Sequence, residues 1–114
     1  MPREVRSIIF TRDEVLVSLR GYWLHRSEMP KGKLDKFTIS SSGPIEIEAV
    51  YDAAHPTRQV RRMNEADIGA ALLLTCLNQK IPVPRKSERQ LQRFGDMIGL
   101  VVTIGLNQKG PSAT

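Results

Sequence analysis

The chain carries the same succession of structural signals twice, and this repetition constrains its fold more than any other feature of the sequence. Each copy begins with a helix N-cap residue, and in the first copy Glu14 stands three residues later and completes a capping box. A proline, a basic linker, a short strand, a glycine turn and an alternating strand follow each helix. We therefore predict an internal β-α-β-β duplication with pseudo-twofold symmetry, its halves spanning about 3–52 and 58–104. The matched positions lie 52 or 53 residues apart: Thr11 with Asn64, Leu19 with Leu72, Pro30 with Pro82, Ile39 with Leu91, and Gly43 with Gly95.

The strand signals predict an α+β fold. Six short strands, joined mostly as hairpins, favour an antiparallel sheet, and two apolar helices on one face of it make a two-layer sandwich. The segment from Glu88 to Phe94 fits either a strand or a helical turn. At 114 residues the chain fits one domain, expected over 1–104, with 105–114 as a flexible tail. The last strand of each half alternates as a half-buried strand does, with Ile45, Ile47, Ala49 and Tyr51 in one half and Ile98, Leu100, Val102 and Ile104 in the other.

The second predicted helix is apolar around more than half of its surface. Its main stripe is widened by Leu73, Leu74 and Leu77, which a helix covering a single sheet face does not need. The extra face must contact either the first helix or another subunit. This feature favours a protein–protein interaction module, or a self-associating homodimer that pairs through the second helix.

Positive charge is concentrated in the second half of the chain. The net charge is +5, and residues 58–114 carry all of it, with nine Lys/Arg against four Asp/Glu. Clustered arginine suits bidentate contacts to phosphate, so we predict low-specificity binding of nucleic acid, DNA or RNA, or of another polyanion. Scattered arginines that only solubilise the surface are the competing interpretation. The residues expected to bind are Arg58, Arg61, Arg62, Arg85, Lys86, Arg89 and Arg93.

Little in the sequence favours catalysis. His25 and His55 fall at a helix end and in a turn, and Cys76 lies among leucines, where a thiol acts as a small apolar side chain. Glu46 and Glu48 share one strand face but have no acidic counterparts in the second half. We therefore expect a non-enzymatic binding module without cofactor, metal or small-molecule substrate. The lone cysteine and the absence of a signal peptide or an apolar span predict a cytoplasmic protein that does not enter a membrane.

Overall fold

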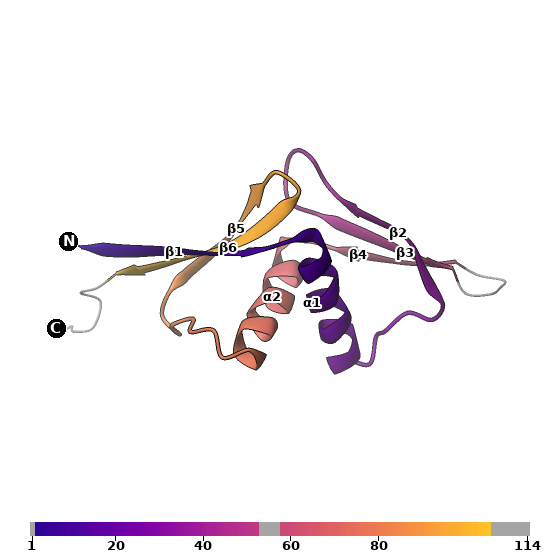
Figure 1. Ribbon diagram of the computed structural model, residues 1–114, viewed down its shortest axis with the longest axis horizontal. Coiled ribbons are helices and arrows are strands. Elements are labelled where there is room, and N and C mark those ends of the chain that lie inside the picture. Colours follow the sequence, from indigo (N-terminus) through magenta and orange to yellow (C-terminus); the bar gives the residue numbers. More distant parts are fainter. Residues whose placement is uncertain (1, 53–57, 106–114) are drawn as a thin grey trace.

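The fold was analysed in a computed structural model that describes residues 2–52 and 58–105. Two helices and six strands follow one another in the order β-α-β-β twice (Figure 1). The segment that fitted either a strand or a helical turn is a strand. The flexible tail predicted for 105–114 and the turn expected at 52–57 lie almost entirely outside the described residues. The elements are β1 (Arg3–Phe10), α1 (Arg12–His25), β2 (Lys33–Ile39), β3 (Ile47–Asp52), β4 (Arg58–Met63), α2 (Glu65–Asn78), β5 (Glu88–Phe94) and β6 (Met97–Gly105).

The strands form two antiparallel sheets, each of three strands, so the α+β class is confirmed and the expectation of one continuous sheet is wrong. The orders are β1-β6-β5, here called the β5 sheet, and β2-β3-β4, here called the β2 sheet. The first strand of each half pairs with the last strand of the other half, because β1 pairs with β6 and β4 with β3. Neither half can therefore complete its sheet alone. That the two halves arose by duplication stays a prediction.

The two sheets contact each other through side chains. No strand of one sheet pairs by backbone hydrogen bonds with a strand of the other in the described chain, so they count as separate sheets. The tips of the two hairpins lie next to each other at the top of Figure 1. There Arg93 of β5 donates to the carbonyl oxygens of Ser40 (3.0 Å) and Gly43 (3.3 Å). Lower down, the Glu65 carboxylate accepts from the backbone N–H of Ile45 (2.9 Å). Each contact satisfies polar backbone groups that a neighbouring strand would otherwise satisfy.

The helices begin and end in matching ways. The Thr11 hydroxyl accepts from the Glu14 N–H and Asn64 Oδ1 from the Asp67 N–H, which confirms both N-caps. At the other ends, Ser27 and Lys80 adopt positive φ angles of 57° and 59°. The backbone N–H of the following residue then donates to a carbonyl oxygen of the last helical turn, Glu28 to Trp23 and Ile81 to Cys76, as in a Schellman motif. The helices thus stop several residues before the prolines that were expected to end them.

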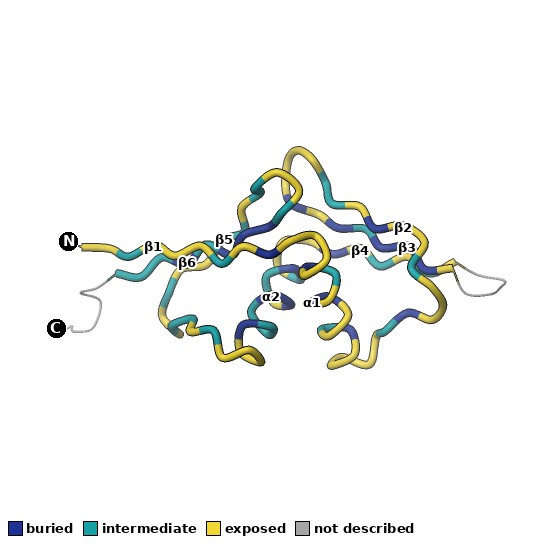
Figure 2. Tube along the Cα trace, viewed as in Figure 1, coloured by how far each residue is buried: buried dark blue, intermediate teal, exposed yellow. Residues whose placement is uncertain are grey.

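One apolar core joins the two helices to both sheets. Its centre contains Trp23 of α1 and Tyr51 of β3, whose rings meet edge to face with centroids 6.1 Å apart. Figure 2 shows that the buried positions follow the central strands and the facing sides of the helices. The helices also share a hydrogen bond from the Thr75 hydroxyl to that of Ser18 (2.8 Å). Part of the wide apolar face of α2 therefore packs against α1.

The molecule is elongated, with extents of 60 × 29 × 18 Å and a radius of gyration of 16.5 Å. A compact chain of this length has a radius of gyration of about 13 Å. The excess arises because the two sheets extend to opposite sides of the helix pair (Figure 1). Each sheet consequently keeps accessible faces and edges. Across residues 2–52 and 58–105, no helix is both long and apolar enough to cross a membrane.

Candidate functional site

The seven predicted polyanion-binding residues lie on two different sheets. Three are on β4, an edge strand of the β2 sheet, and the other four are on β5 or in the linker that precedes it. The seven residues therefore do not line a single strand or helix. The β4 group is Arg58, Arg61 and Arg62, and the β5 group is Arg85, Lys86, Arg89 and Arg93.

The three β4 arginines have partners within the molecule. Arg58 pairs with Asp35 at 2.7 Å and Arg62 with Glu48 at 3.1 Å. Arg61 donates to the backbone carbonyl oxygen of Glu28 at 3.1 Å, which ties the linker after α1 to the β4 edge. Surface ion pairs such as the first two are weak, about 0–1 kcal/mol, yet they lower the charge that is available to a ligand.

The β5 group keeps more of its charge. Arg93 is used at the junction of the sheets, but Arg85 and Lys86 are exposed. The Arg89 guanidinium donates to the backbone carbonyl oxygen of Arg85 at 3.1 Å. Within the described part of the chain, none of Arg85, Lys86 and Arg89 has a carboxylate within 4.0 Å. These three residues are therefore a compact positive group at the start of β5.

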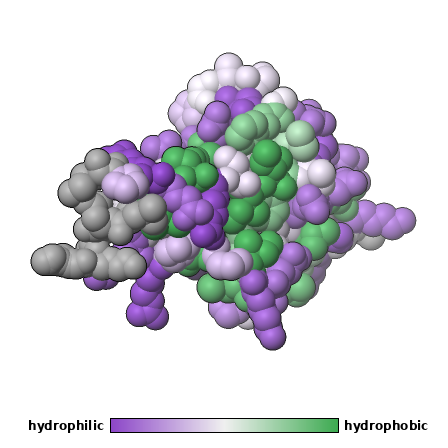
Figure 3. Space-filling model, turned by 60° about the vertical axis from the view of Figure 1, so that its left-hand side comes forward, coloured by the Kyte–Doolittle hydropathy of each residue, from purple (hydrophilic) through white to green (hydrophobic). Residues whose placement is uncertain are grey.

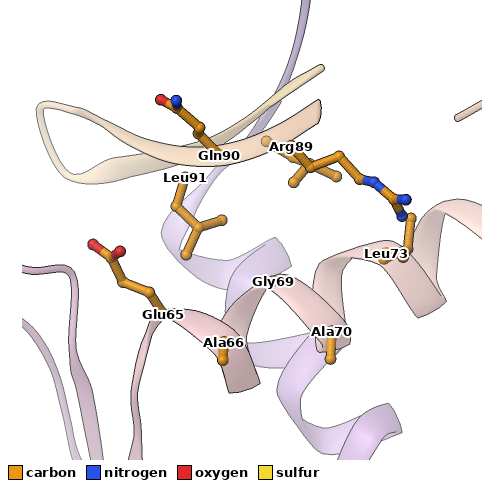
Figure 4. A pocket seen from close by; sticks show the side chains of 9 residues that line it. Glu65, Ala66, Gly69, Ala70, Leu73, Arg89, Gln90 and Leu91 are labelled. Carbon is orange, nitrogen blue, oxygen red and sulfur yellow. The ribbon is translucent and has the colours of Figure 1, made fainter. Parts of the chain in front are cut away.

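A groove of about 440 Å³ runs between α2 and β5, next to this positive group (Figure 4). Leu91 points from β5 toward the helix and Leu100 of β6 is buried beneath it. The helix side is low, and a Cβ atom added at Gly69 would meet nothing within 4 Å. The groove is open because three of the five helix residues that line it are alanine or glycine. The helix residues that line it are Glu65, Ala66, Gly69, Ala70 and Leu73.

The groove lies beside a free strand edge. Among the described strands, β5 pairs with β6 alone and is therefore an edge of its sheet. An edge strand presents backbone N–H and C=O groups that can pair with another extended chain. Sequence reasoning missed this site, although Ala66, Gly69 and Ala70 give a signal for it. Their spacing places them on one helix face, where their small size leaves room.

Apolar side chains are also exposed outside the groove. Leu24 of α1 and Leu77 of α2 are 65% and 63% exposed, and Val17 lines a smaller cleft of about 180 Å³ between the helices. On the face drawn in Figure 3, hydrophobic residues gather into a continuous area bordered by hydrophilic ones. Because Val17, Leu24 and Leu77 are exposed, the helix pair offers a second apolar surface, although its cleft is less than half the size of the groove.

The residues considered for catalysis do not form a cluster. His25 is exposed at the end of α1, whereas Cys76 is fully buried in the core, where desolvation raises the pKa of its thiol. His55 lies outside the described residues. Glu46 and Glu48 line a surface cavity of about 420 Å³ on the β2 sheet, where Glu48 is held by Arg62. In the parts of the chain that the structure covers, no three His, Cys, Asp or Glu side chains are grouped as metal ligands would be.

The comparisons with known proteins add nothing to this description, because no family model, curated protein or solved structure matches the chain.

Proposed function

We propose that this protein is a non-enzymatic binding module and that its ligand is a segment of another protein, held in the groove between α2 and β5. The observation that carries the proposal is the position of a groove of about 440 Å³ directly beside the free edge of β5. The combination offers an extended chain two kinds of interaction at once. The strand edge supplies main-chain hydrogen bonds, and the groove supplies apolar burial for alternate side chains.

Two further observations support a binding role over a catalytic one. The only cysteine is buried, and burial raises the pKa of its thiol, so the nucleophilic thiolate is disfavoured. His25 is exposed at the end of α1, whereas the thiol is buried in the core. A reduced, buried thiol also supports a cytoplasmic location, which is part of this proposal.

Polyanion binding is the second candidate function, and one observation favours it. Arg85, Lys86 and Arg89 are close together and have no carboxylate partner in the described chain. Binding to duplex DNA or RNA through these residues would weaken with salt, with a log–log slope of about −0.9 per phosphate contacted on B-DNA. The expected site is smaller than the seven residues predicted from the sequence, because the β4 arginines are paired internally.

Self-association through the helix pair is a third candidate, favoured by the exposure of Leu24 and Leu77. Sedimentation over a range of concentrations tests it directly. Replacement of Leu77 by glutamate should abolish any dimer that forms through α2, because a charge would then be buried at the interface.

The protein-binding proposal is tested by selecting displayed random peptides against the immobilised full-length chain. We expect enrichment of peptides that bind the wild-type protein and lose binding when Gly69→Leu fills the groove. Gly21→Leu is the matched control, since Gly21 is an open helical glycine on α1. Selected peptides that bind both variants as well as the wild-type protein would overturn the proposal, as would the absence of any enrichment.

A further inference from the structure

We propose that the ligand of the groove is an acidic, extended peptide that adds to the β5 sheet as a fourth strand, antiparallel to β5. This inference rests on the proposed function and specifies its ligand. Three properties of the groove lead to it: its length and direction, the charge at its ends, and the sequence of β5 itself.

The geometry suits a short extended segment. In Figure 4 α2 runs from Glu65 to Leu73 while β5 runs the opposite way, with Arg89 above Leu73 and Leu91 closer to Glu65. From Glu65 to Leu73 the helix rises by eight steps of about 1.5 Å, which is about 12 Å. An extended chain covers that distance in about four residues at 3.3 Å each. Two of the four side chains would then point toward the small residues of α2.

The charges at the two ends of the groove differ and decide where acidic residues of the peptide lie. Arg89 stands at one end, its guanidinium held by the carbonyl oxygen of Arg85, with Lys86 next to them and no carboxylate opposite. Glu65 stands at the other end, and its carboxylate is already engaged by the Ile45 N–H. Acidic residues are therefore favoured at the Arg89 end. In an antiparallel strand this is the carboxyl end of the peptide.

A second copy of this chain fits the edge poorly. If β5 paired with the β5 of another molecule about Leu91, Arg89 of each copy would face Arg93 of the other. Like charges directly opposite each other across two strands are destabilising. A partner strand with acidic residues at that position replaces this repulsion with attraction.

The test uses two synthetic hexapeptides, blocked at both ends, in which alternating valine and threonine are followed by two aspartates or by two lysines. We expect the aspartate peptide to bind the full chain about tenfold more tightly in an NMR titration. Arg89→Glu should reverse that preference, because the charge at the end of the groove changes sign. Gly69→Leu should weaken the aspartate peptide at least about tenfold, whereas Gly21→Leu should change its affinity by less than about twofold.

Backbone methylation tests for strand addition separately. Methyl groups on the peptide nitrogens that face β5 should abolish binding, because main-chain hydrogen bonds hold an added strand. Methyl groups on the alternate nitrogens, which face away, should leave binding intact. Circular dichroism and thermal melts of each protein variant establish that a loss of binding does not come from unfolding.

Each alternative outcome is distinct. The inference is wrong if both peptides bind equally, or if both methylation patterns have the same effect. It is also wrong if neither peptide binds while a duplex oligonucleotide binds the wild-type and Gly69→Leu proteins alike, since the charge then serves a polyanion. A concentration-dependent dimer that Gly69→Leu disrupts assigns the groove to a second copy. If selected peptides are blocked by Gly69→Leu but carry no acidic residues, the proposed function stands and this inference fails.

Discussion

The α1–β2 side and the α2–β5 side of the molecule are built from the same elements, but a long side chain crosses the first gap and an open groove of about 440 Å³ occupies the second. The first residue of α1 is Arg12, whose guanidinium donates to the carbonyl oxygen of Phe37 on β2 and stacks 5.0 Å above the Phe37 ring. The first residue of α2 is Glu65, which turns away to the Ile45 N–H. At the second, fifth and sixth positions after the N-cap, α1 has Asp13, Leu16 and Val17 where α2 has Ala66, Gly69 and Ala70.

The difference shows that side-chain size and one arginine decide whether a shared architecture leaves room for a ligand. Arg12 occupies a backbone acceptor of β2, which is an edge strand just as β5 is. Among the described residues of the second side, no α2 side chain donates a hydrogen bond to β5, and a groove of about 440 Å³ lies between helix and strand. The positive group of Arg85, Lys86 and Arg89 lies next to this open groove. The proposed binding site therefore combines a groove with a nearby positive group.

The largest expected effect would show that both sides depend on one core. Leu19→Ala and Leu72→Ala remove fully buried side chains at the same helix position and should each cost about 2–5 kcal/mol of unfolding free energy. Urea denaturation followed by circular dichroism and Trp23 fluorescence should give a single transition for each variant. Leu24→Ala and Leu77→Ala, in the same helices but exposed, should stay within about 0.5 kcal/mol. A Trp23 transition unmoved by Leu72→Ala would mean that the two halves unfold independently.

A smaller loss of stability is expected from a change in the β5 sheet. On the β5 sheet the Phe94 ring lies over Gly99, and a Cβ atom added there would stand 2.3 Å from a ring carbon. Gly99→Ala should therefore cost about 1–3 kcal/mol, measured by urea denaturation. Phe94→Ala combined with Gly99→Ala should cost less than the two single changes added together. Additive costs would show that the ring does not rest on the glycine.

Removing the side chain that bridges α1 and β2 should lower the unfolding free energy by less again. Arg12→Ala removes the contacts with Phe37 and should lower the unfolding free energy by about 1 kcal/mol. Arg20→Ala makes the same charge change on the exposed part of α1 and should stay within about 0.5 kcal/mol. Equal effects of the two changes in urea denaturation would mean that Arg12 does not bridge α1 and β2.

The smallest expected effect has the opposite sign. Gly21→Ala and Gly69→Ala place a methyl group in open space on α1 and α2 and should each stabilise the protein by about 0.4–1 kcal/mol. The reason is that alanine restricts the unfolded chain and favours helix. Thermal unfolding should show a matching rise for both variants. A loss of stability for Gly69→Ala alone would indicate that the α2–β5 groove is too narrow to hold a methyl group.

Much of the local structure could be predicted from the sequence. The N-caps at Thr11 and Asn64, the alternation along β3 and β6 and the α+β class are correct, and so is the packing of the apolar α2 against the rest of the core. The candidate site could not be found in the same way. The sequence predicts seven basic binding residues, but Arg58 and Arg62 have carboxylate partners that are 23 and 14 residues away in the sequence.

The sequence by itself determined where both helices begin and how β3 and β6 alternate, because caps and apolar periodicity act between residues only a few positions apart. Tertiary structure decided how the strands divide into two sheets, since β1 and β6 join residues from opposite ends of the chain. It also decided which arginines are paired and where a groove opens. Those outcomes depend on contacts between side chains that are far apart in the sequence, and no local pattern specifies such contacts. Arg12 crosses the gap between α1 and β2, whereas alanine and glycine line the α2 side of the groove beside β5.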